Sequence, residues 1–319
     1  MPVYRRATRA GKSASNLTRP AADLKLSRLG PFVLELTSGY LLEATLSLGT
    51  GLVLGFQAYA NVMQQTHTIA TEALRFTLPK LGAGLDGFRI AQISDLHFGP
   101  YSGEPEVRAA MQAVRAARPD LIVLTGDFIT STWLFQYGRR SAEKIVPCAE
   151  LLRELRAPYG VFAILGNHDW ANPDFVADTL RCAGIRVLRN EAVPMERGGT
   201  RFWLAGTDSA MERAADLDRT LSFIPTGEPV VLLAHEPDFA DEAARYPVDI
   251  QLSGHSHGGQ IVLPGVPGYL PPLGRKYPRG LYTVGKLKLY VNRGIGVSGA
   301  PVRVGAAPEV TIVELNSAS

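Results

Sequence analysis

The sequence has little cysteine, and after residue 43 it has almost no net charge. Each of these shortages excludes a class of protein. Only two cysteines occur in 319 residues, Cys148 and Cys182, and they form no CxxC pair. A zinc ribbon, a CxxC redox motif and a disulfide scaffold are therefore excluded. Residues 1–43 carry seven Lys and Arg against three Asp and Glu, a balance of +4, which leaves −1 for the other 276 residues of a chain whose net charge is +3. A body without basic excess is not expected to bind nucleic acid.

Apolar residues are plentiful enough for a folded protein. They make up 46% of the chain, against 20% charged residues, and the length suits one large domain or two small ones. We divide the chain into a basic N-terminal tail (1–43), a membrane anchor or apolar helix (44–66) and a catalytic domain (85–316).

The anchor is predicted from a stretch without charge. No Asp, Glu, Lys or Arg occurs from Ala44 to Thr71, and the strongly apolar part ends at Ala60. That length is borderline for a spanning helix, which needs about 17–20 apolar residues. A signal peptide cleaved after Ala58-Tyr59-Ala60 and an amphipathic or buried helix are the alternatives. We expect a protein associated with the cell membrane through this N-terminal anchor. The basic tail favours a cytoplasmic N-terminus, which places the body on the other side if the helix spans.

The body alternates strands and helices. This order predicts an α/β fold with a partly parallel sheet and helices on its faces. A later strand-rich section predicts a second, more antiparallel sheet. The expected strands are 88–94, 121–125, 161–165, 185–188, 201–205, 230–234 and 250–253, followed by hairpin-like segments at 281–284, 287–291 and 310–315. The expected helices are 106–117, 142–155 (broken or kinked at Pro147) and 174–183.

Polar side chains that bind metals follow five of these strands. The carboxyl ends of strands line the functional crevice of an open α/β sheet, so these residues are expected to converge. Imidazole and carboxylate donors together suit Mn, Fe or Zn. The candidates are Asp95, His97, Asp127, Asn167, His235, His255 and His257.

Seven candidate ligands are too many for one tetrahedral zinc. They suit two divalent metal ions that share a bridging carboxylate. Two such ions generate a hydroxide and clamp the attacking and leaving oxygens in hydrolysis of a phosphate ester or anhydride. His168 is then spare, and a histidine beside the metals can protonate the leaving oxygen.

The five segments resemble the motifs of the calcineurin-like metallophosphoesterase superfamily. Asp95-Leu96-His97, Gly126-Asp127, Gly166-Asn167-His168-Asp169, His235 and Gly254-His255-Ser256-His257 match them in order. The resemblance implies a four-layer α/β/β/α sandwich, with Asp127 bridging. It assigns His168 as the leaving-group acid and Asp169 as the residue that orients it. One metal would be held by Asp95, His97, Asp127 and His257, and the other by Asp127, Asn167, His235 and His255.

A narrower resemblance concerns the region from Asn292 to Val310. It is similar to membrane-associated bacterial phosphodiesterases, some of which hydrolyse the pyrophosphate of UDP-2,3-diacylglucosamine in lipid A synthesis. The implied partners are the membrane and a phosphorylated, lipid-linked small molecule, with 261–273 as a loop for acyl chains or an ordinary covering loop. A UDP-linked precursor requires a cytoplasmic body, and a helix lying flat on the inner leaflet would reconcile this with the charge bias.

Several other residues have competing interpretations. Ser256 lies in a formal G-x-S-x-G, but no Asp or His follows His257, so a serine-hydrolase triad is rejected. Gly294–Gly299 is read as a loop near the metals, not as a dinucleotide motif. Arg293 and Arg303 are candidates for phosphate contact or for structural ion pairs. His67 lies outside the pattern.

The function expected from the sequence is therefore a dinuclear metal-dependent phosphohydrolase. The alternatives are a broad phosphomonoesterase, a cyclic-nucleotide phosphodiesterase and a non-catalytic membrane-tethered scaffold.

Overall fold

The computed structural model describes residues 47–48, 50–58, 61–62, 66–131, 142–265 and 268–318, and it divides the chain into two units, 1–57 and 58–319. In the first unit, residues 50–57 are helical, and Leu52 and Phe56 are exposed. No helix among the described residues is long and apolar enough to cross a membrane. The anchor expected over 44–66 lies partly outside the described residues and stays a prediction, as does the tail 1–43.

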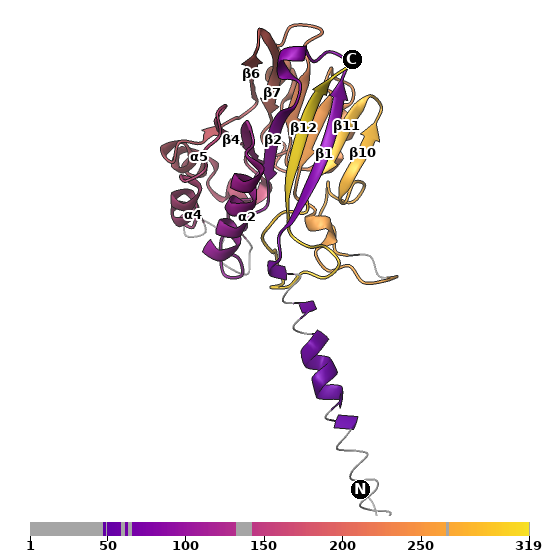
Figure 1. Cartoon of the computed structure of the whole chain (residues 1–319). Helices are drawn as coiled ribbons and strands as arrows, with labels where there is room; N and C mark the ends of the chain where they lie inside the picture. Colours follow the sequence, from indigo (N-terminus) through magenta and orange to yellow (C-terminus); the bar gives the residue numbers. More distant parts are fainter. Residues whose placement is uncertain are drawn as a thin grey trace, which may run out of the picture. The chain divides into compact units, whose positions relative to one another are not determined.

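The first sheet of the second unit is mixed, with the strand order β1-β12-β2-β3-β4-β5 (Figure 1). Strands β2 to β5 run parallel, whereas β12 is antiparallel to β2 and parallel to β1. β3 is apolar and buried throughout, as expected for a strand covered on both faces. The strands are β1 (Ala70–Leu78), β12 (Glu309–Ser317), β2 (Phe88–Ile93), β3 (Leu121–Leu124), β4 (Val161–Ala163) and β5 (Arg186–Val187).

The second sheet has the order β10-β11-β9-β8-β7-β6. Its central strands β7, β8, β9 and β11 run parallel, and the edge strands β6 and β10 are antiparallel to their neighbours. The strands are β6 (Glu191–Arg197), β7 (Thr200–Gly206), β8 (Val230–Leu233), β9 (Ile250–Ser253), β10 (Gly280–Val284) and β11 (Leu287–Val291). The fold is therefore α/β with two mixed sheets.

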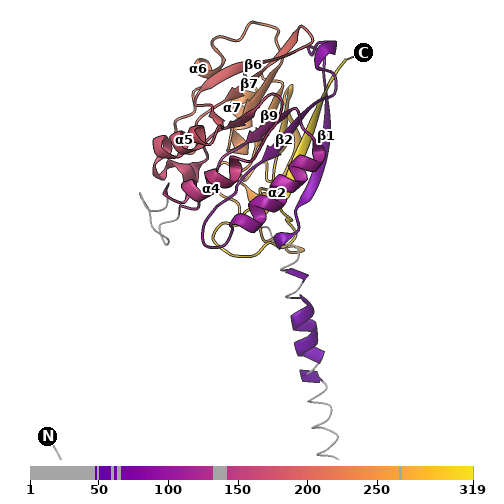
Figure 2. The ribbon, with the colours of Figure 1, turned by 60° about the vertical axis from the view of Figure 1, so that its left-hand side comes forward.

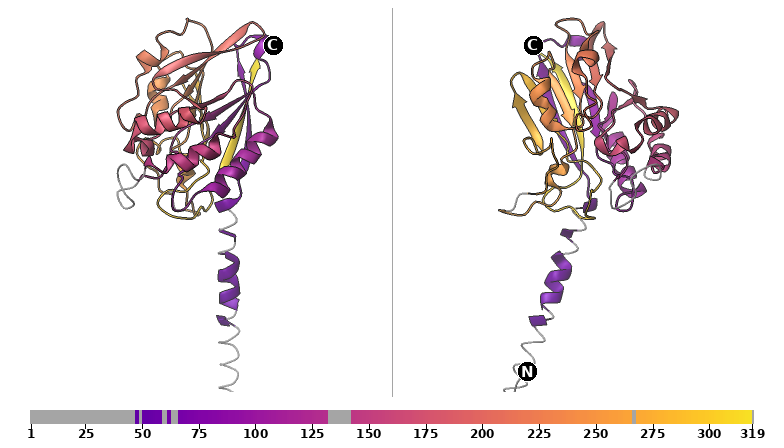
Figure 3. Two further views of the ribbon diagram at one scale, coloured as in Figure 1. Left: turned by 90° about the vertical axis from the view of Figure 1, so that its left-hand side faces the viewer. Right: turned by 180° about the vertical axis from the view of Figure 1, so that it is seen from behind.

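Helices cover the outer faces of the sheets. Figure 2 shows α2, α4 and α5 in front of the first sheet, and the view from behind in Figure 3 shows them on one side of the sheets. α6 and α7 pack on the second sheet. The helices are α2 (Glu104–Ala117), α4 (Ile145–Leu152), α5 (Pro173–Cys182), α6 (Leu217–Leu221) and α7 (Ala240–Ala243), with the short 3-10 helices η2 (Ala83–Leu85), η3 (Asn167–Ala171), η4 (Pro237–Phe239) and η5 (His257–Gly259).

Buried hydrophobic side chains of the described residues form three clusters. One lies between the first sheet and α2, α4 and α5, one between the two sheets, and one between the second sheet and α6 and α7. Alternation along β2 divides its residues between layers, because Ile90 faces the second sheet whereas Ala91 and Ile93 face the helices. Apolar packing between the two sheets therefore fixes their positions relative to each other.

Some expected elements differ from those observed. The segment 310–315 was expected near the late hairpin, but β12 returns to the first sheet. The helix expected from Ala142 begins at Ile145, so that Pro147 falls in the first turn, where its missing N–H costs nothing. β1 and β6 were not predicted, and the second sheet is parallel at its centre.

Candidate metal centre

The predicted ligands lie in loops at the carboxyl ends of parallel strands. Asp95 and His97 follow β2, Asp127 follows β3, and Asn167 begins η3 after β4. The second sheet supplies His235 after β8, and His255 and His257 after β9. Segments spread over about half the chain are therefore placed at one edge of the paired sheets, as the strand order requires.

Direct hydrogen bonds join the two sheets at this edge. The backbone N–H of His255 donates to Asp95 Oδ1 at 2.9 Å, and Gln92 Nε2 donates to the carbonyl of Ser253 at 3.0 Å. Both links are buried, so each sheet fixes the position of the other's loops.

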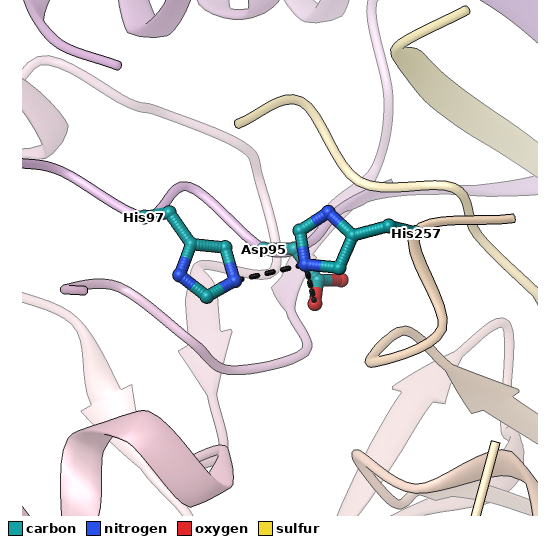
Figure 4. Close-up of side chains that lie close together, drawn as sticks. All are labelled: Asp95, His97 and His257. Atoms are coloured by element: carbon teal, nitrogen blue, oxygen red, sulfur yellow. Dashed lines mark hydrogen bonds and ion pairs between the residues drawn. The ribbon is translucent and has the colours of Figure 1, made fainter. Parts of the chain in front are cut away.

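Asp95, His97 and His257 form the first group of ligand atoms (Figure 4). The Nε2 atoms of His97 and His257 lie 2.9 Å apart, and His257 Nε2 lies 3.5 Å from Asp95 Oδ1. Arg303 Nη2 lies 3.2 Å from the other ring nitrogen of His257, Nδ1. Asp95, His97 and His257 supply two ring nitrogens and a carboxylate oxygen that could hold a cation.

Asp127, His235 and His255 form the second group. One oxygen of Asp127, Oδ2, lies 3.2 Å from His235 Nε2 and 3.5 Å from His97 Nε2. The other oxygen, Oδ1, accepts a hydrogen bond of 2.8 Å from the backbone N–H of His168. The Oδ2 atom therefore faces a histidine of each group.

The donor set fits divalent cations. His235 Nδ1 donates to the carbonyl of Thr125 at 2.6 Å, and His255 Nε2 donates to that of Pro272 at 2.8 Å. Each contact leaves the lone pair on the other ring nitrogen, which is how backbone carbonyls orient histidine ligands. His235 Nε2 and Asn167 Oδ1 are buried without a hydrogen-bond partner, an unfavourable state that a cation would relieve.

Backbone strain gathers in the same loops. Asp95, His97, Asp127, His255 and His257 all have positive φ, between 44° and 70°. Such conformations cost about 1–3 kcal/mol each for residues other than glycine, and they persist where the surrounding structure imposes them. These loops are therefore held in one shape by their neighbours.

Close glycine contacts contribute to that shape. A Cβ on Gly166 would lie 2.3 Å from Asp127 Oδ1, and one on Gly294 would lie 2.5 Å from Asp95 Cβ. Only glycine lets these backbones approach so closely. The Gly294–Gly299 segment is thus a loop beside the site, as expected.

Burial determines the charges at the site. It lowers the pKa of His97 to about 3 and holds that of His257 well below its usual range. Burial works against ionisation of Asp127, yet His235 and His168 hold its pKa well below the ordinary value. Uncharged imidazoles and an ionised carboxylate are the protonation states that bind metals. Burial also opposes a charge on His235, but Asp127 raises its pKa well above the usual value, so a proton or a cation satisfies this pair.

His168 lies beside the two groups and lines the cavity. Its Nδ1 accepts a hydrogen bond of 3.1 Å from the backbone N–H of Ser131, while the Ser131 hydroxyl donates to the His168 carbonyl at 2.8 Å. Because Nδ1 is an acceptor, the neutral ring carries its proton on Nε2.

Asp169 contacts backbone groups of the neighbouring loops. Its carboxylate accepts backbone hydrogen bonds from Asp127 and Gly166 on Oδ2, both at 2.9 Å, and from Phe128 on Oδ1 at 3.0 Å. The His168 ring contacts Ser131 through Nδ1 and packs edge-to-face on the His97 ring. Asp169 thus fixes the backbone of the Asp127 loop, and its predicted role in orienting His168 stays a prediction.

The two candidate arginines have structural roles. Arg293 Nη2 forms ion pairs with Glu309 at 2.6 Å and Glu72 at 2.7 Å. Arg303 is completely buried and donates to the carbonyls of Gly296 and Ala306. Arg293 therefore matches the ion-pair alternative, whereas Arg303 has an unexpected role, because its guanidinium group binds the backbone of a loop.

Two other sequence interpretations match the contacts. The hydroxyl of Ser256 donates to the carbonyl of Pro278, which agrees with its rejection as a nucleophile. His67 lies apart from the site, with Nδ1 3.0 Å from Glu106 Oε1.

The role of Glu236, which follows the proposed ligand His235, was not predicted from the sequence. Glu236 is buried and accepts hydrogen bonds from the backbone of Ala210 and Met211. This contact fixes the loop that brings Met211 to the cavity. A lone acidic residue beside a predicted ligand carries no sequence signal for such a role.

A cavity of about 620 Å³ opens over the site. Asp127, Asn167, His168, His255 and His257 lie along its polar part. Its wall also contains apolar residues, namely Met211, Ile261, Tyr269, Pro271, Pro272 and Ala300. The site can thus receive a molecule with a polar reacting group and an apolar portion.

Comparison with known proteins identifies the family. The profile of the calcineurin-like phosphoesterase family matches residues 88–259. The uncharacterized metallophosphoesterase YkuE of Bacillus subtilis is 36% identical, over 82% of this chain and 91% of its own length. The chain belongs to the calcineurin-like phosphoesterase family. It is a phosphoester hydrolase of a family that uses divalent metals, and the two groups of His and Asp atoms in this phosphoesterase are candidates to hold them.

Two further relatives have informative names. A "Transmembrane protein with metallophosphoesterase domain" of Danio rerio is 29% identical, over 88% of this phosphoesterase and 64% of the relative. The "UDP-2,3-diacylglucosamine pyrophosphatase LpxG" of Chlamydia trachomatis is 27% identical, over 75% of this chain and 87% of the relative.

Proposed function

We propose that this phosphoesterase is a dinuclear metal-dependent hydrolase of phosphodiester or pyrophosphate bonds. The proposal is carried by the position of Asp127 Oδ2 between His97 of one ligand group and His235 of the other. One carboxylate oxygen in that position can serve two cations. We ascribe the sheets and their helices to the four-layer α/β/β/α sandwich expected of the family. The proposed ligands are Asp95, His97, Asp127, Asn167, His235, His255 and His257.

The chain's own residues orient the reaction. When bound, two divalent cations supply Lewis acidity at the phosphoryl group and lower the pKa of water there. His168 would hold a proton at Nε2 for the leaving oxygen, since Ser131 occupies Nδ1. Asp169 would keep the Asp127 loop in place. The nitrogen and oxygen donors suit Mn, Fe or Zn.

A lipid-linked substrate is favoured by the cavity. Apolar side chains beside the polar floor suit a phosphorylated molecule with acyl chains. The name of the Chlamydia relative makes UDP-2,3-diacylglucosamine the candidate to test first. Cleavage of its pyrophosphate would place this phosphoesterase in lipid A synthesis.

A membrane location agrees with that substrate. The helical residues 50–58 expose several large apolar side chains, and contact of such side chains with water is unfavourable. They are Leu52, Val53, Leu54 and Phe56. The Danio rerio relative is named as a transmembrane protein. We therefore propose that residues 44–66 attach this chain to the membrane.

A substrate panel tests the proposal. The full chain in detergent micelles with added Mn should hydrolyse UDP-2,3-diacylglucosamine and bis(p-nitrophenyl) phosphate with a higher kcat/KM than p-nitrophenyl phosphate or cyclic AMP. Chelation with EDTA should abolish turnover, and added Mn should restore it. The His168→Ala variant should lose turnover by about 10²–10⁴-fold, the contribution of a general acid. A preference for the monoester or the cyclic nucleotide would replace the proposal by the corresponding alternative.

A further inference from the structure

Exposed apolar side chains gather at one edge of the cavity. We call Ile261, Leu263, Tyr269 and Leu273 the apolar rim; Tyr269 is 81% exposed and Leu263 is 48% exposed. Ile261 and Tyr269 line the cavity, and their segments touch, because a Cβ on Gly268 would lie 2.5 Å from the Gly259 carbonyl oxygen. Exposed apolar side chains beside a cavity mouth are a candidate interaction surface.

The N-terminal segment joins the domain beside this rim. Thr66 Oγ1 accepts a hydrogen bond of 2.9 Å from the backbone N–H of Arg303. The next residue, Val304, pairs with the segment that carries Ile261, which we call the rim segment. The Val304 carbonyl accepts a hydrogen bond of 2.8 Å from Val262 N–H, and the Val304 N–H donates to the Gln260 carbonyl at 2.9 Å. Thr66 therefore contacts Arg303, and the residue after Arg303 pairs with the segment that carries Ile261 and Leu263.

Chain length limits how far the exposed apolar helix can be from the rim. Residue 58, the last described residue of that helical stretch, precedes Thr66 by eight residues, which span at most about 29 Å when fully extended. The helical residues 61–62 within this span shorten the reach further. Residue 58 is therefore tethered within about 29 Å of Thr66, the residue that contacts Arg303 beside the rim segment.

Two exposed arginines flank the rim. Arg275 Nε donates to the carbonyl of Leu270, next to Tyr269, and Arg279 Nη1 donates to that of Gly305, next to Val304. Positive charge beside a tyrosine and aliphatic side chains is the composition of surfaces that sit at the interface of anionic bilayers.

We infer that the apolar rim docks into the interfacial region of a lipid bilayer, so that the cavity mouth opens on the lipid surface. The inference rests on the membrane location proposed above, and it adds a second point of contact besides the anchor. Substrate would then enter the cavity from the membrane, with its apolar portion along Ile261 and Tyr269.

Fluorescent probes on the full chain test the docking. In a Cys182→Ser background, Leu263→Cys and Tyr269→Cys would each carry an NBD label, since Cys148 is buried and burial raises the pKa of its thiol. Phe223→Cys is the control, because Phe223 is 86% exposed and lies outside the cavity lining. Each protein would be mixed with phosphatidylethanolamine–phosphatidylglycerol vesicles, with or without lipid carrying a doxyl quencher on its acyl chain.

The expected result is a blue shift and doxyl quenching for the probes at 263 and 269, with neither change at 223. Probes at 263 and 269 that keep their aqueous emission, absence of vesicle binding, or equal quenching at all three positions would overturn the inference. The readout does not require catalysis. Quenching at the rim in a protein without phosphohydrolase activity would leave the docking intact and reject the proposed function.

Discussion

The carboxylate of Asp169 accepts a hydrogen bond of 2.9 Å from the backbone N–H of Asp127. Asp169, which is not a proposed ligand, thus fixes the backbone of Asp127, the proposed ligand that faces both groups. The same carboxylate binds Gly166 and Phe128, so it braces the loops after β3 and β4 together. Because Asp127 has φ of 55°, its position depends on such bracing.

Asp169→Asn should weaken metal binding without removing a ligand. The amide cannot accept all three backbone N–H groups, so the Asp127 loop should lose part of its support. Loss of a residue that positions ligands typically costs about 10–100-fold in metal affinity. Activity titrated against Mn should therefore show a midpoint raised by that factor, with kcat largely restored at saturation. Asp216→Asn, which keeps a capping residue on α6, is the control; equal midpoints in both variants would reject the bracing role.

Asp127→Asn should cut turnover by orders of magnitude and lower the metal content, with the fold retained. The amide replaces the carboxylate whose Oδ2 faces both histidine groups. Elemental analysis and turnover of the same preparation check this, with Asp178→Asn on the surface of α5 as the matched control. Normal hydrolysis by Asp127→Asn with added Mn would refute the metal assignment.

Gly254→Ala should disrupt the first ligand group. The added Cβ would lie 2.0 Å from Ser94 Oγ and 2.2 Å from Asp95 Oδ2, so the Asp95 loop must move. We expect a lower metal content and a lower melting temperature. Gly103→Ala is the control, since its Cβ would lie no closer than 3.9 Å to Pro105 Cδ. A variant at Gly254 that binds metal normally would show that the loop tolerates the shift.

Phe202→Ala should destabilise the contact between the two sheets. Phe202 is fully buried in the cluster between them and makes an edge-to-face contact with Phe88, with ring centroids 5.2 Å apart. Such truncations cost about 3–5 kcal/mol. Denaturant unfolding should show this loss, whereas Phe223→Ala at an exposed site should change the unfolding free energy by less than about 0.5 kcal/mol. Similar values for the two variants would contradict the assigned core.

The strands of the site could be predicted because their signal is local. β3 and β8 are short apolar runs, and polar residues follow each within two positions; parallel strands bring such ends to one edge. The placement of β12 could not be predicted in this way. Its pairing with β1 and β2 depends on contacts more than 200 residues apart, which hydrophobic periodicity does not encode.

The contacts that orient the site were also beyond the sequence. His235 and His255 are held by the carbonyls of Thr125 and Pro272, and His168 by the N–H of Ser131. Every residue has a carbonyl, and nearly every one has an N–H, so these partners leave no pattern. The roles of Arg293 and Arg303 could not be predicted for a related reason, because only folding brings their partners next to them.

The insertion of β12 between β1 and β2 has a consequence for biosynthesis. During translation, β1 and β2 leave the ribosome early, but residues 309–317 must also emerge before they can enter one ladder. Until then β2 has an open edge and β1 has no neighbour, a state prone to misassociation. Truncations that remove this strand should therefore yield insoluble chains, even though they spare every proposed ligand.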